Sequence, residues 1–349
     1  MMSQIWDKKI LEANKELWDF ELTSGERNEV EDLLFGTDQI SFQDTPTLRL
    51  KSSSALKSKL EAGIKEVDQG FGVFSLRGFN SSEYTERQCM MIHLFIGSHV
   101  GNLRPQPGGG LLDHITDINK RKQGLRLLYS QTDQHMHFHT DSCDVASLMC
   151  YKNAAFGGES QVASGLGLYQ AMASRHSDLC PYLFDPLPYS RNVEVQVTQE
   201  PWFMMPVFNH YQDELLCYYN PQYAEMTQRL HPAAPRLKEQ HYAALAALAA
   251  LLKSGEFVST TKFEEGQIQF LNNHSCLHAR TDYVDGDSAK NTRHLFRLWL
   301  SPESARPLPE YYASRWGSTQ PGVRGGIKTS TTSMTVLTLD ELVSKLKPI

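Results

Sequence analysis

The stretch Gln134-His135-Met136-His137-Phe138-His139-Thr140-Asp141 decides how the rest of the chain is interpreted. It alternates imidazoles with other side chains and ends in a carboxylate. Alternate residues of a β-strand point to the same face, so His139 and Asp141 can direct two ligands at one point from one strand end. Two histidines and one carboxylate on one side of a metal leave its other coordination positions open. The stretch therefore predicts two of the three protein ligands of such a site.

The third ligand is expected to be another histidine far along the chain. His278 is the candidate, near the end of the segment 270–280. The segment 293–300 follows it and alternates as a strand does, with Arg293 and Arg297 on one face.

Spacing alone leaves several alternatives open. A single His-x-Asp triplet also arises by chance, and His135 and His137 share the alternating phase of His139. A three-histidine site and a strand with a solvent-facing polar side are both compatible with this pattern. His274 is likewise in phase with His278, so the distal ligand is ambiguous on spacing.

Composition narrows the classes of partner. The chain has 349 residues, 40% hydrophobic and 21% charged, with 34 basic and 40 acidic side chains and a net charge of -6. This is ordinary globular usage, and no long basic run offers a surface for nucleic acid or a polybasic membrane anchor. A small-molecule substrate is therefore expected. A homo-oligomer stays open, because composition does not test it.

The cysteines and the N-terminus indicate a reducing, cytoplasmic setting. The six cysteines form no C-x-x-C pair and are expected to be reduced and mostly buried. The first 20 residues mix charged and apolar side chains, unlike a signal peptide, and no window approaches 18 apolar residues.

The pattern of elements predicts a mainly β fold with decorating helices, an α+β chain with a jelly-roll core. Helices are expected at 3–20 (or an ordered arm there), 55–68, 168–175, 236–252 and 340–346, and another beginning at Ser81 or Ser82. Strands are expected at 71–76, 125–129, 146–151, 267–271 and 293–300, and the segment 156–162 is expected to be a turn that enters a strand. A hairpin is expected from 203–209 and 214–219. The Gly/Pro-rich segment 104–110 is either a lid or a plain loop.

Four blocks together resemble the taurine dioxygenase (TauD/TfdA-like) family. They are Phe138-His139-Thr140-Asp141, Gly157-Gly158-Glu159-Ser160, the segment 272–281 and the segment 293–300, in the order and at the separations of the family. The resemblance implies a double-stranded β-helix (jelly-roll, cupin-like) fold and the use of Fe(II), 2-oxoglutarate and O2. It implies an oxygenase domain at 71–320, preceded by a helical arm at 1–70 packed on the core and followed by a C-terminal tail at 321–349.

The resemblance also implies roles for individual residues. His139, Asp141 and His278 match the catalytic iron ligands of the family. Arg297 matches the arginine that pairs with the distal carboxylate of 2-oxoglutarate, which suits a planar guanidinium.

Two further cosubstrate residues follow from the same resemblance. Arg293 is the alternative to Arg297, because the loop after His278 is longer than in taurine dioxygenase. Ser160 stands where relatives have a threonine that touches the same cosubstrate. His135, His137 and His274 have no ligand counterpart, which favours structural roles for them.

The implied activity is that of an oxidoreductase, an Fe(II)- and 2-oxoglutarate-dependent dioxygenase. It would hydroxylate an unactivated C–H bond of a small, anionic or amino-acid-like substrate and release succinate and CO2. Asp141 disfavours halogenation, because related halogenases lack this carboxylate. Arg104, Arg280 and the 203–220 hairpin are candidate substrate contacts.

The alternatives come from other classes. The same iron chemistry could serve desaturation or oxidative cyclisation in a biosynthetic pathway. A non-catalytic cupin-like protein that binds a metal or small molecule is a second alternative, against which the intact Arg297 argues. A hydrolytic zinc enzyme using His135, His137 and His139 is a third.

Overall fold

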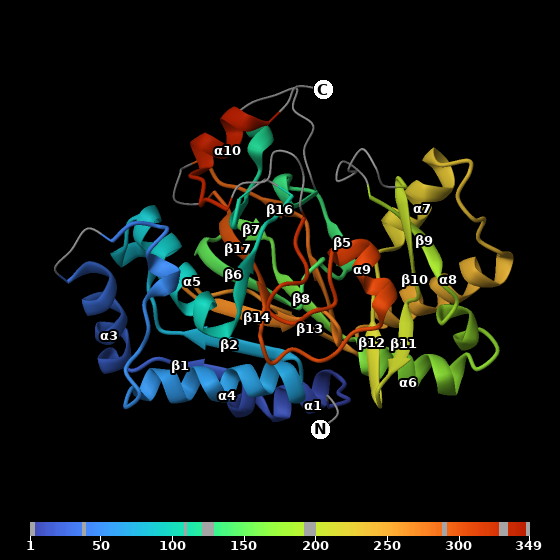
Figure 1. Cartoon of the computed structure of the whole chain (residues 1–349), viewed down its shortest axis with the longest axis horizontal. Coiled ribbons are helices and arrows are strands. Elements are labelled where there is room, and N and C mark those ends of the chain that lie inside the picture. The colour runs from blue at the N-terminus through green and yellow to red at the C-terminus, as the bar shows by residue number, and fades with distance from the viewer. Residues whose placement is uncertain are drawn as a thin grey trace.

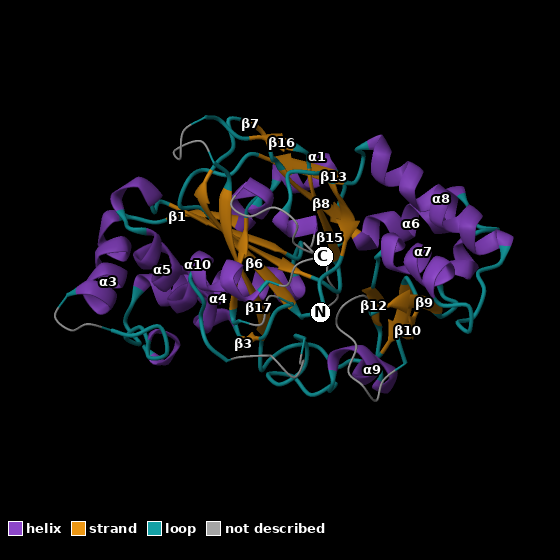
Figure 2. Ribbon diagram, turned by 90° about the horizontal axis from the view of Figure 1, so that it is seen from above, coloured by secondary structure: helices purple, strands orange, loops and turns teal. Residues whose placement is uncertain are grey.

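The structure is a computed structural model that describes residues 4–36, 40–107, 110–120, 129–191, 200–287, 292–327 and 334–346. Two β-sheets lie opposite one another at its centre (Figure 1, Figure 2). The larger sheet has the order β1 (Asp19–Glu21), β2 (Val73–Arg77), β14 (Ile268–Asn272), β6 (Val145–Lys152), β17 (His294–Ser301) and β3 (Asn102–Arg104), and β4 (Leu112–Ile115) also pairs with β17. The smaller sheet has the order β13 (Val258–Thr261), β8 (Ser160–Ser164), β15 (Cys276–Arg280) and β5 (Met136–His139). The jelly-roll core expected from the sequence is present.

Strand β17 shows why this sequence forms a central strand. All eight of its residues are buried, because one face packs under helices and the other lines the space between the sheets. Phe296, Leu298 and Leu300 belong to the core cluster on the helix side, while Arg297 and Trp299 face the interior. Charged side chains can occupy a buried strand here only because the interior offers them partners.

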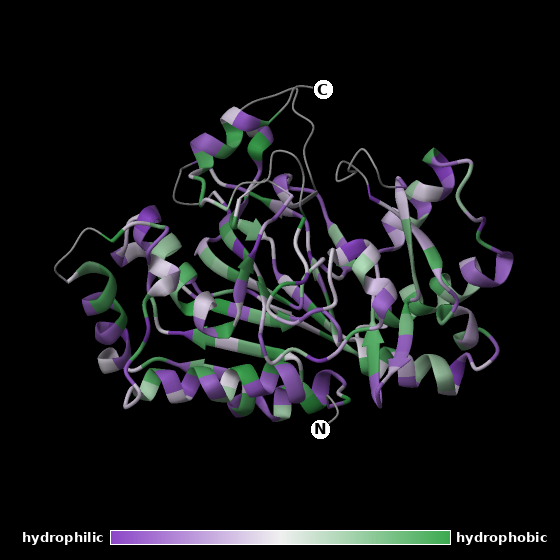
Figure 3. Cartoon of the chain, in the orientation of Figure 1, coloured by the Kyte–Doolittle hydropathy of each residue, from purple (hydrophilic) through white to green (hydrophobic). Residues whose placement is uncertain are grey.

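Two helices cover the outer face of the larger sheet. Helix α4 (Ala55–Gln69) begins at Ser54, whose side chain accepts a hydrogen bond from the Lys57 amide, and helix α5 (Glu86–Val100) lies beside it. Gly63 allows α4 to approach the sheet closely, because a Cβ there would come within 2.5 Å of the Phe74 ring. Figure 3 shows the resulting pattern, with hydrophobic strands at the centre and hydrophilic colours on the outer helices.

The expected helix at 55–68 is therefore confirmed, but the cap expected for the following helix is wrong. Ser81–Glu83 form a 3₁₀ turn, and Thr85 is the N-cap of α5. Thr85 and Gln88 make a reciprocal capping box, which satisfies two otherwise unpaired amides, so it outcompetes the serines.

An insertion between β8 and β13 builds a second hydrophobic core. It contains α6 (Gly165–Arg175), β9 (Leu187–Ser190), β10 (Trp202–Met205), β11 (Phe208–Tyr211), β12 (Glu214–Cys217), α7 (Pro221–Leu230) and α8 (Glu239–Ser254). The expected hairpin is present as β11 and β12, joined by Gln212 and Asp213 with φ of 48° and 63°. Its first strand is shorter than expected, because residues 202–205 pair with β9 instead.

The remaining segments pack around these layers. The N-terminal part contributes α1 (Lys8–Ala13), α2 (Lys15–Trp18) and α3 (Ser24–Phe35), and its strand β1 extends the edge of the larger sheet. Strands β7 (Phe156–Gly157) and β16 (Tyr283–Val284) pair with each other, and α9 (Ala313–Trp316) and α10 (Leu339–Lys345) belong to the C-terminal part.

Two segments singled out from the sequence lie partly outside the described residues. The strand expected at 125–129 lies outside the described residues except for its last residue, and residues 108 and 109 of the 104–110 loop also lie outside them. Arg104, a candidate substrate contact, is buried, and its Nε donates to the Gly325 carbonyl at 3.2 Å. No helix among the described residues is long and apolar enough to cross a membrane.

A buried ion pair fastens the C-terminal part to the core. The Asp144 carboxylate accepts hydrogen bonds from Arg324 Nε at 2.8 and 3.0 Å and from Ser301 Oγ at 2.8 Å, and His274 Nε2 lies 2.8 Å from it. The Arg324 guanidinium also donates to the Thr319 and Arg306 carbonyls. His274 is therefore held by Asp144 rather than by a metal site.

We expect Arg324→Met to destabilise the fold by about 3–5 kcal/mol, because Asp144 would be left buried without its charged partner. Urea unfolding of the full chain measures this loss. Arg175→Met is the matched control, since the Arg175–Glu256 pair is exposed and should contribute little. Equal effects of the two changes would contradict the structural role given to Arg324.

Candidate active site

Two histidines face each other across neighbouring strands of the smaller sheet. His139 ends β5 and His278 lies in β15, directly opposite in register, with ring centroids 4.3 Å apart. The His139 Nδ1–H donates to the His137 carbonyl at 2.8 Å, which leaves Nε2 free as a lone-pair donor. His278 turns its Nε2 toward Asp141, and its buried Nδ1 has no hydrogen-bond partner.

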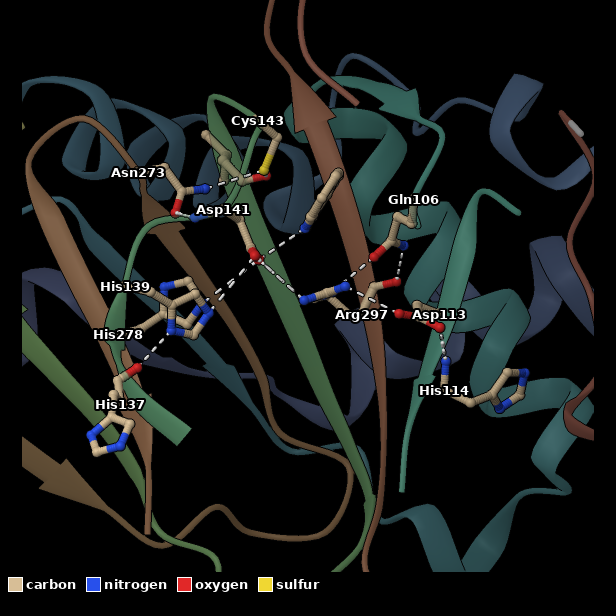
Figure 4. Close-up of polar contacts among 12 residues, drawn as sticks. Gln106, Asp113, His114, His137, His139, Asp141, Cys143, Asn273, His278 and Arg297 are labelled. Atoms are coloured by element: carbon tan, nitrogen blue, oxygen red, sulfur yellow. Dashed lines mark hydrogen bonds and ion pairs between the residues drawn. The ribbon is translucent and has the colours of Figure 1, made fainter. Parts of the chain in front are cut away.

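Asp141 completes this group from the loop that follows β5 (Figure 4). Its Oδ1 lies 3.8 Å from His139 Nε2, and its Oδ2 lies 3.6 Å from His278 Nε2. The Asp141 amide donates to Asn273 Oδ1, and Trp299 Nε1–H donates to Asp141 Oδ2 at 2.8 Å. The first bond holds the Asp141 backbone, and the second fixes the direction of its carboxylate.

The ionisation states suit metal ligation. Burial and the neighbouring His278 lower the pKa of His139 to about 4, so its ring is neutral at pH 7. Burial alone would raise the pKa of Asp141, but Arg297 and the two imidazoles outweigh it and hold that pKa well below its usual range. A neutral His139 imidazole and an ionised Asp141 carboxylate are the protonation states that a metal ion requires of these two ligands.

The donor set fits the iron site expected from the sequence. One ligand atom from each of His139, Asp141 and His278 lies within 4.8 Å of the others. Two imidazoles and a carboxylate on one side of a metal match the arrangement of non-haem iron(II) centres. His135 and His137 stack edge-on against each other, 4.8 Å between centroids, and do not join this group.

Arg297, the first candidate for the cosubstrate, already has protein partners for its whole guanidinium. Its Nε donates to Gln106 at 2.8 Å, its Nη2 donates to Asp113 at 3.0 Å, and its Nη1 lies 3.4 Å from both oxygens of Asp141 (Figure 4). Burial alone would lower the pKa of Arg297, but the Asp141 and Asp113 carboxylates raise it above its ordinary value. Its charge is compensated inside the protein.

Arg293, the alternative candidate, has the opposite surroundings. Its Nη1 is buried and has no hydrogen-bond partner. Burial and the neighbouring Arg280 cation lower the pKa of Arg293 to about 10. Gly158 makes room for it, since a Cβ at that position would lie 2.9 Å from Arg293 Nε, and the φ of +76° suits glycine.

Arg280 and Tyr283 share this environment with Arg293. The Cζ atoms of Arg280 and Arg293 lie 4.8 and 5.2 Å from the centroid of the Tyr283 ring. Arg280 Nη1 and the Tyr283 hydroxyl are also buried without a hydrogen-bond partner. Ser160 is buried and stands opposite Arg280 in the pairing of β8 with β15, so both point to the same face of the smaller sheet. We call Ser160, Arg280, Tyr283 and Arg293 the cationic pocket.

Several of these residues were missed by the sequence analysis. Asp113, Gln106 and the indole of Trp299 were not expected near the metal ligands, because no motif or spacing connects them to the histidines. Tyr283 could have been suspected only as an aromatic residue close to His278 and Arg280.

Comparisons with known proteins show which proteins this chain is similar to. A sequence model described as "Taurine catabolism dioxygenase TauD, TfdA family" matches residues 29–299. The chain is 24% identical to FR-33289 synthase of Streptomyces rubellomurinus over 327 residues, which cover 90% of this chain and 94% of that protein. It is 27% identical over 270 residues to taurine hydroxylase-like protein SAT17 of Stachybotrys chartarum, which cover 73% of this chain and 67% of that protein.

Solved structures with the same fold carry the expected ligands. Asparagine oxygenase in complex with Fe(II), 3-hydroxyasparagine and succinate has a TM-score of 0.59 at 14% identity, covering 81% of this chain and 93% of that one. The non-haem iron oxygenase OrfP with Fe and α-ketoglutaric acid has a TM-score of 0.58 at 16% identity, with the same coverage. Their likeness confirms the fold class predicted from the sequence.

Proposed function

The chain belongs to the taurine catabolism dioxygenase TauD, TfdA family, whose members use Fe(II), 2-oxoglutarate and O2, and we propose that it hydroxylates a small amino-acid-like or anionic substrate. In the balanced reaction, one atom of O2 enters the substrate as a hydroxyl group. The other enters succinate as 2-oxoglutarate loses CO2. The group His139, Asp141 and His278 is the observation that carries this proposal.

His139, Asp141 and His278 would hold the iron through the two Nε2 atoms and a carboxylate oxygen. Bound there with 2-oxoglutarate and O2, the iron supplies the oxidising power that the protein side chains lack. The protein orients the ligands: the His137 carbonyl fixes the His139 ring, and Trp299 fixes the Asp141 carboxylate. Such outer partners keep a site ready for its metal.

The contacts of the two arginines favour Arg293 over Arg297 for the cosubstrate. Arg297 is neutralised by Asp113 and Asp141, so a further carboxylate would have to displace an existing partner. Arg293 Nη1 is buried and unpaired, which is costly unless an anion arrives. We therefore assign the distal carboxylate of 2-oxoglutarate to Arg293, and to Arg297 the task of holding Asp141.

The other members of the cationic pocket support this assignment. Arg280 and the Tyr283 hydroxyl offer further unpaired donors beside Arg293, and Ser160 offers its hydroxyl. Arg280 follows His278 by two residues, on the same face of β15, which is about 6.6 Å along a strand. A five-carbon dicarboxylate that chelates a metal at one end can span such a separation with its other end.

The class of substrate is inferred from the relatives. The solved structures of asparagine oxygenase and OrfP contain hydroxylated asparagine and hydroxylated arginine, and FR-33289 synthase is named for a biosynthetic product. Free amino acids and small biosynthetic intermediates of similar size are therefore the first substrates to test. Desaturation or cyclisation of such a compound would use the same residues.

The test is a substrate screen with the iron-loaded full chain, which measures succinate and oxidised product together. A true substrate should raise succinate formation above the uncoupled rate, with product formed in equal amount. Succinate formation that needs both iron and 2-oxoglutarate would also separate this proposal from a zinc hydrolase. A protein that binds iron but forms no succinate with any compound would instead be a binding protein.

We expect Trp299→Phe to weaken iron(II) binding by about 10-fold, since the ring would be kept and only the hydrogen bond to Asp141 lost. Anaerobic iron titration measures the affinity. Trp202→Phe is the control, because that indole lies in β10 of the insertion. Unchanged iron affinity in Trp299→Phe would show that the indole does not orient the carboxylate.

A further inference from the structure

A second group of ligand side chains lies outside the proposed active site. Glu86 stands in the first turn of α5, His114 lies in β4, and His294 is the first residue of β17. One ligand atom from each lies within 4.8 Å of the others, with both histidines buried and Glu86 half-buried. Three separate elements thus converge on one point.

This group is on the opposite face of the sheet from the iron ligands. His114 pairs with Phe296, and the preceding residue, Asp113, pairs with Arg297. Asp113 and Arg297 bond each other in the interior, so His114, Phe296 and His294 point the other way, toward α5. An ion bound here would not share ligands with the proposed iron site.

The hydrogen bonds prepare the two imidazoles for a cation. His114 Nε2–H donates to the Leu337 carbonyl at 2.9 Å, so Nδ1 of the neutral ring is a lone-pair donor. This Nδ1 lies 2.8 Å from His294 Nε2. Because Nδ1 of His114 carries no proton, His294 Nε2–H is the donor of this hydrogen bond. A metal ion that replaced this proton would gain both nitrogens as ligands, with a backbone carbonyl as the outer partner of one of them.

The surroundings and the spacing suit a small divalent cation. The ring centroid of Phe296 lies 5.5 Å from that of His114 and 4.9 Å from that of His294. The Tyr151 centroid lies 5.6 Å from that of His294, so aromatic rings pack against both histidines. Ligands around four-coordinate zinc lie about 3.3 Å apart. The two imidazole nitrogens lie 2.8 Å apart, and no two ligand atoms of the group lie more than 4.8 Å apart. Shifts of about 1.5 Å or less would bring them all to the zinc spacing. Glu86 can make the larger shift because it is half-buried.

We propose that Glu86, His114 and His294 form a second metal site, which takes Zn2+ with a water molecule as fourth ligand. Two imidazoles, one carboxylate and a water are a common donor set for zinc. The ion would tie α5 to β4 and β17. Through the His114–Leu337 bond it would also fasten the segment that precedes α10.

The experiment removes the active-site ligands first. The full chain carrying His139→Ala and His278→Ala is titrated anaerobically with Zn2+ and with Co2+, whose visible absorption reports a four-coordinate site. We expect one equivalent to bind, with a Co2+ spectrum, and to be lost on addition of Glu86→Gln. That change keeps the size of the side chain and lies on a half-buried helix turn, so the fold should survive it.

Two controls make the result decisive. Adding His135→Ala and His137→Ala to the same background should leave binding unchanged, although these rings lie only 4.8 Å apart. Zinc at about 100 times its dissociation constant should raise the melting temperature by several degrees, and Glu86→Gln should remove that rise. No binding in the background variant, or binding that depends on His135 and His137 instead of Glu86, would overturn the proposal.

Discussion

Replacing His139 with alanine is expected to abolish iron binding and turnover together. The imidazole Nε2 lies 3.8 Å from Asp141 Oδ1, and the ring lies against that of His278, so the change removes one of the three proposed protein ligands. Loss of an outer partner alone typically costs 10–100-fold in metal affinity or activity, so loss of a ligand should exceed about 100-fold. Anaerobic iron titration and succinate formation measure the two effects separately.

His137→Ala is the matched control for this change. His137 belongs to the same strand and carries the same side chain, but only its backbone carbonyl contacts His139. Alanine keeps that carbonyl, so iron affinity should stay close to that of the unchanged protein. An inactive His137→Ala together with an active His139→Ala would move the metal ligand by two residues and revive the three-histidine alternative.

The sequence could predict part of the candidate metal site, because the strand period that directs His139 is a local feature. The alternation of β5 places His139 at the end of a strand. The resemblance to the family, and not the spacing, singled out His278, which the fold brings opposite His139 in register. His274, equally in phase, is drawn instead into the pair with Asp144, and no local pattern could show this. The strand period gives the direction of a side chain, but not its partner.

The role of the two arginines depended on contacts that spacing does not contain. Arg293 and Arg297 are four residues apart, Arg293 directly before β17 and Arg297 within it, so the strand period gives both the same phase. They differ because Asp113 and Gln106, almost 200 residues earlier, neutralise and orient only Arg297. Tertiary contacts therefore decide which of the two guanidinium groups keeps a buried nitrogen without a hydrogen-bond partner, and only Arg293 does so, at its Nη1.

Arg293→Met is expected to weaken 2-oxoglutarate binding strongly while leaving iron(II) affinity nearly unchanged. Its unpaired Nη1 would be the partner of the distal carboxylate, and truncating one side of a buried charge pair costs about 2–5 kcal/mol. The lower limit corresponds to a rise of about 30-fold in the dissociation constant. Titration of 2-oxoglutarate into the anaerobic iron-loaded protein, followed by its charge-transfer absorption, measures it.

Arg297→Met should give the opposite pattern. It leaves Asp113 and Asp141 buried together without their shared cation, so the carboxylate that would hold the iron loses its orientation. Iron affinity should fall, while the affinity for 2-oxoglutarate measured at saturating iron should change less than in Arg293→Met. The two variants therefore form a matched pair, with the same substitution at positions four residues apart.

A 2-oxo acid without the distal carboxylate, such as 2-oxovalerate, isolates the contact itself. It can still chelate the iron, but it has no anion to offer the cationic pocket. The loss of affinity of 30-fold or more that we expect for Arg293→Met with 2-oxoglutarate should therefore vanish with 2-oxovalerate. This compound has no distal carboxylate, so the unchanged protein and the variant should bind it equally well.

Arg280→Met should show a smaller loss of affinity for 2-oxoglutarate of the same kind, since Arg280 adds a second cation beside the same Tyr283 ring. If Arg297→Met alone shows a loss that depends on the distal carboxylate, the cosubstrate must displace Asp113 from Arg297. Arg293 would then be free to bind an anionic group of the substrate.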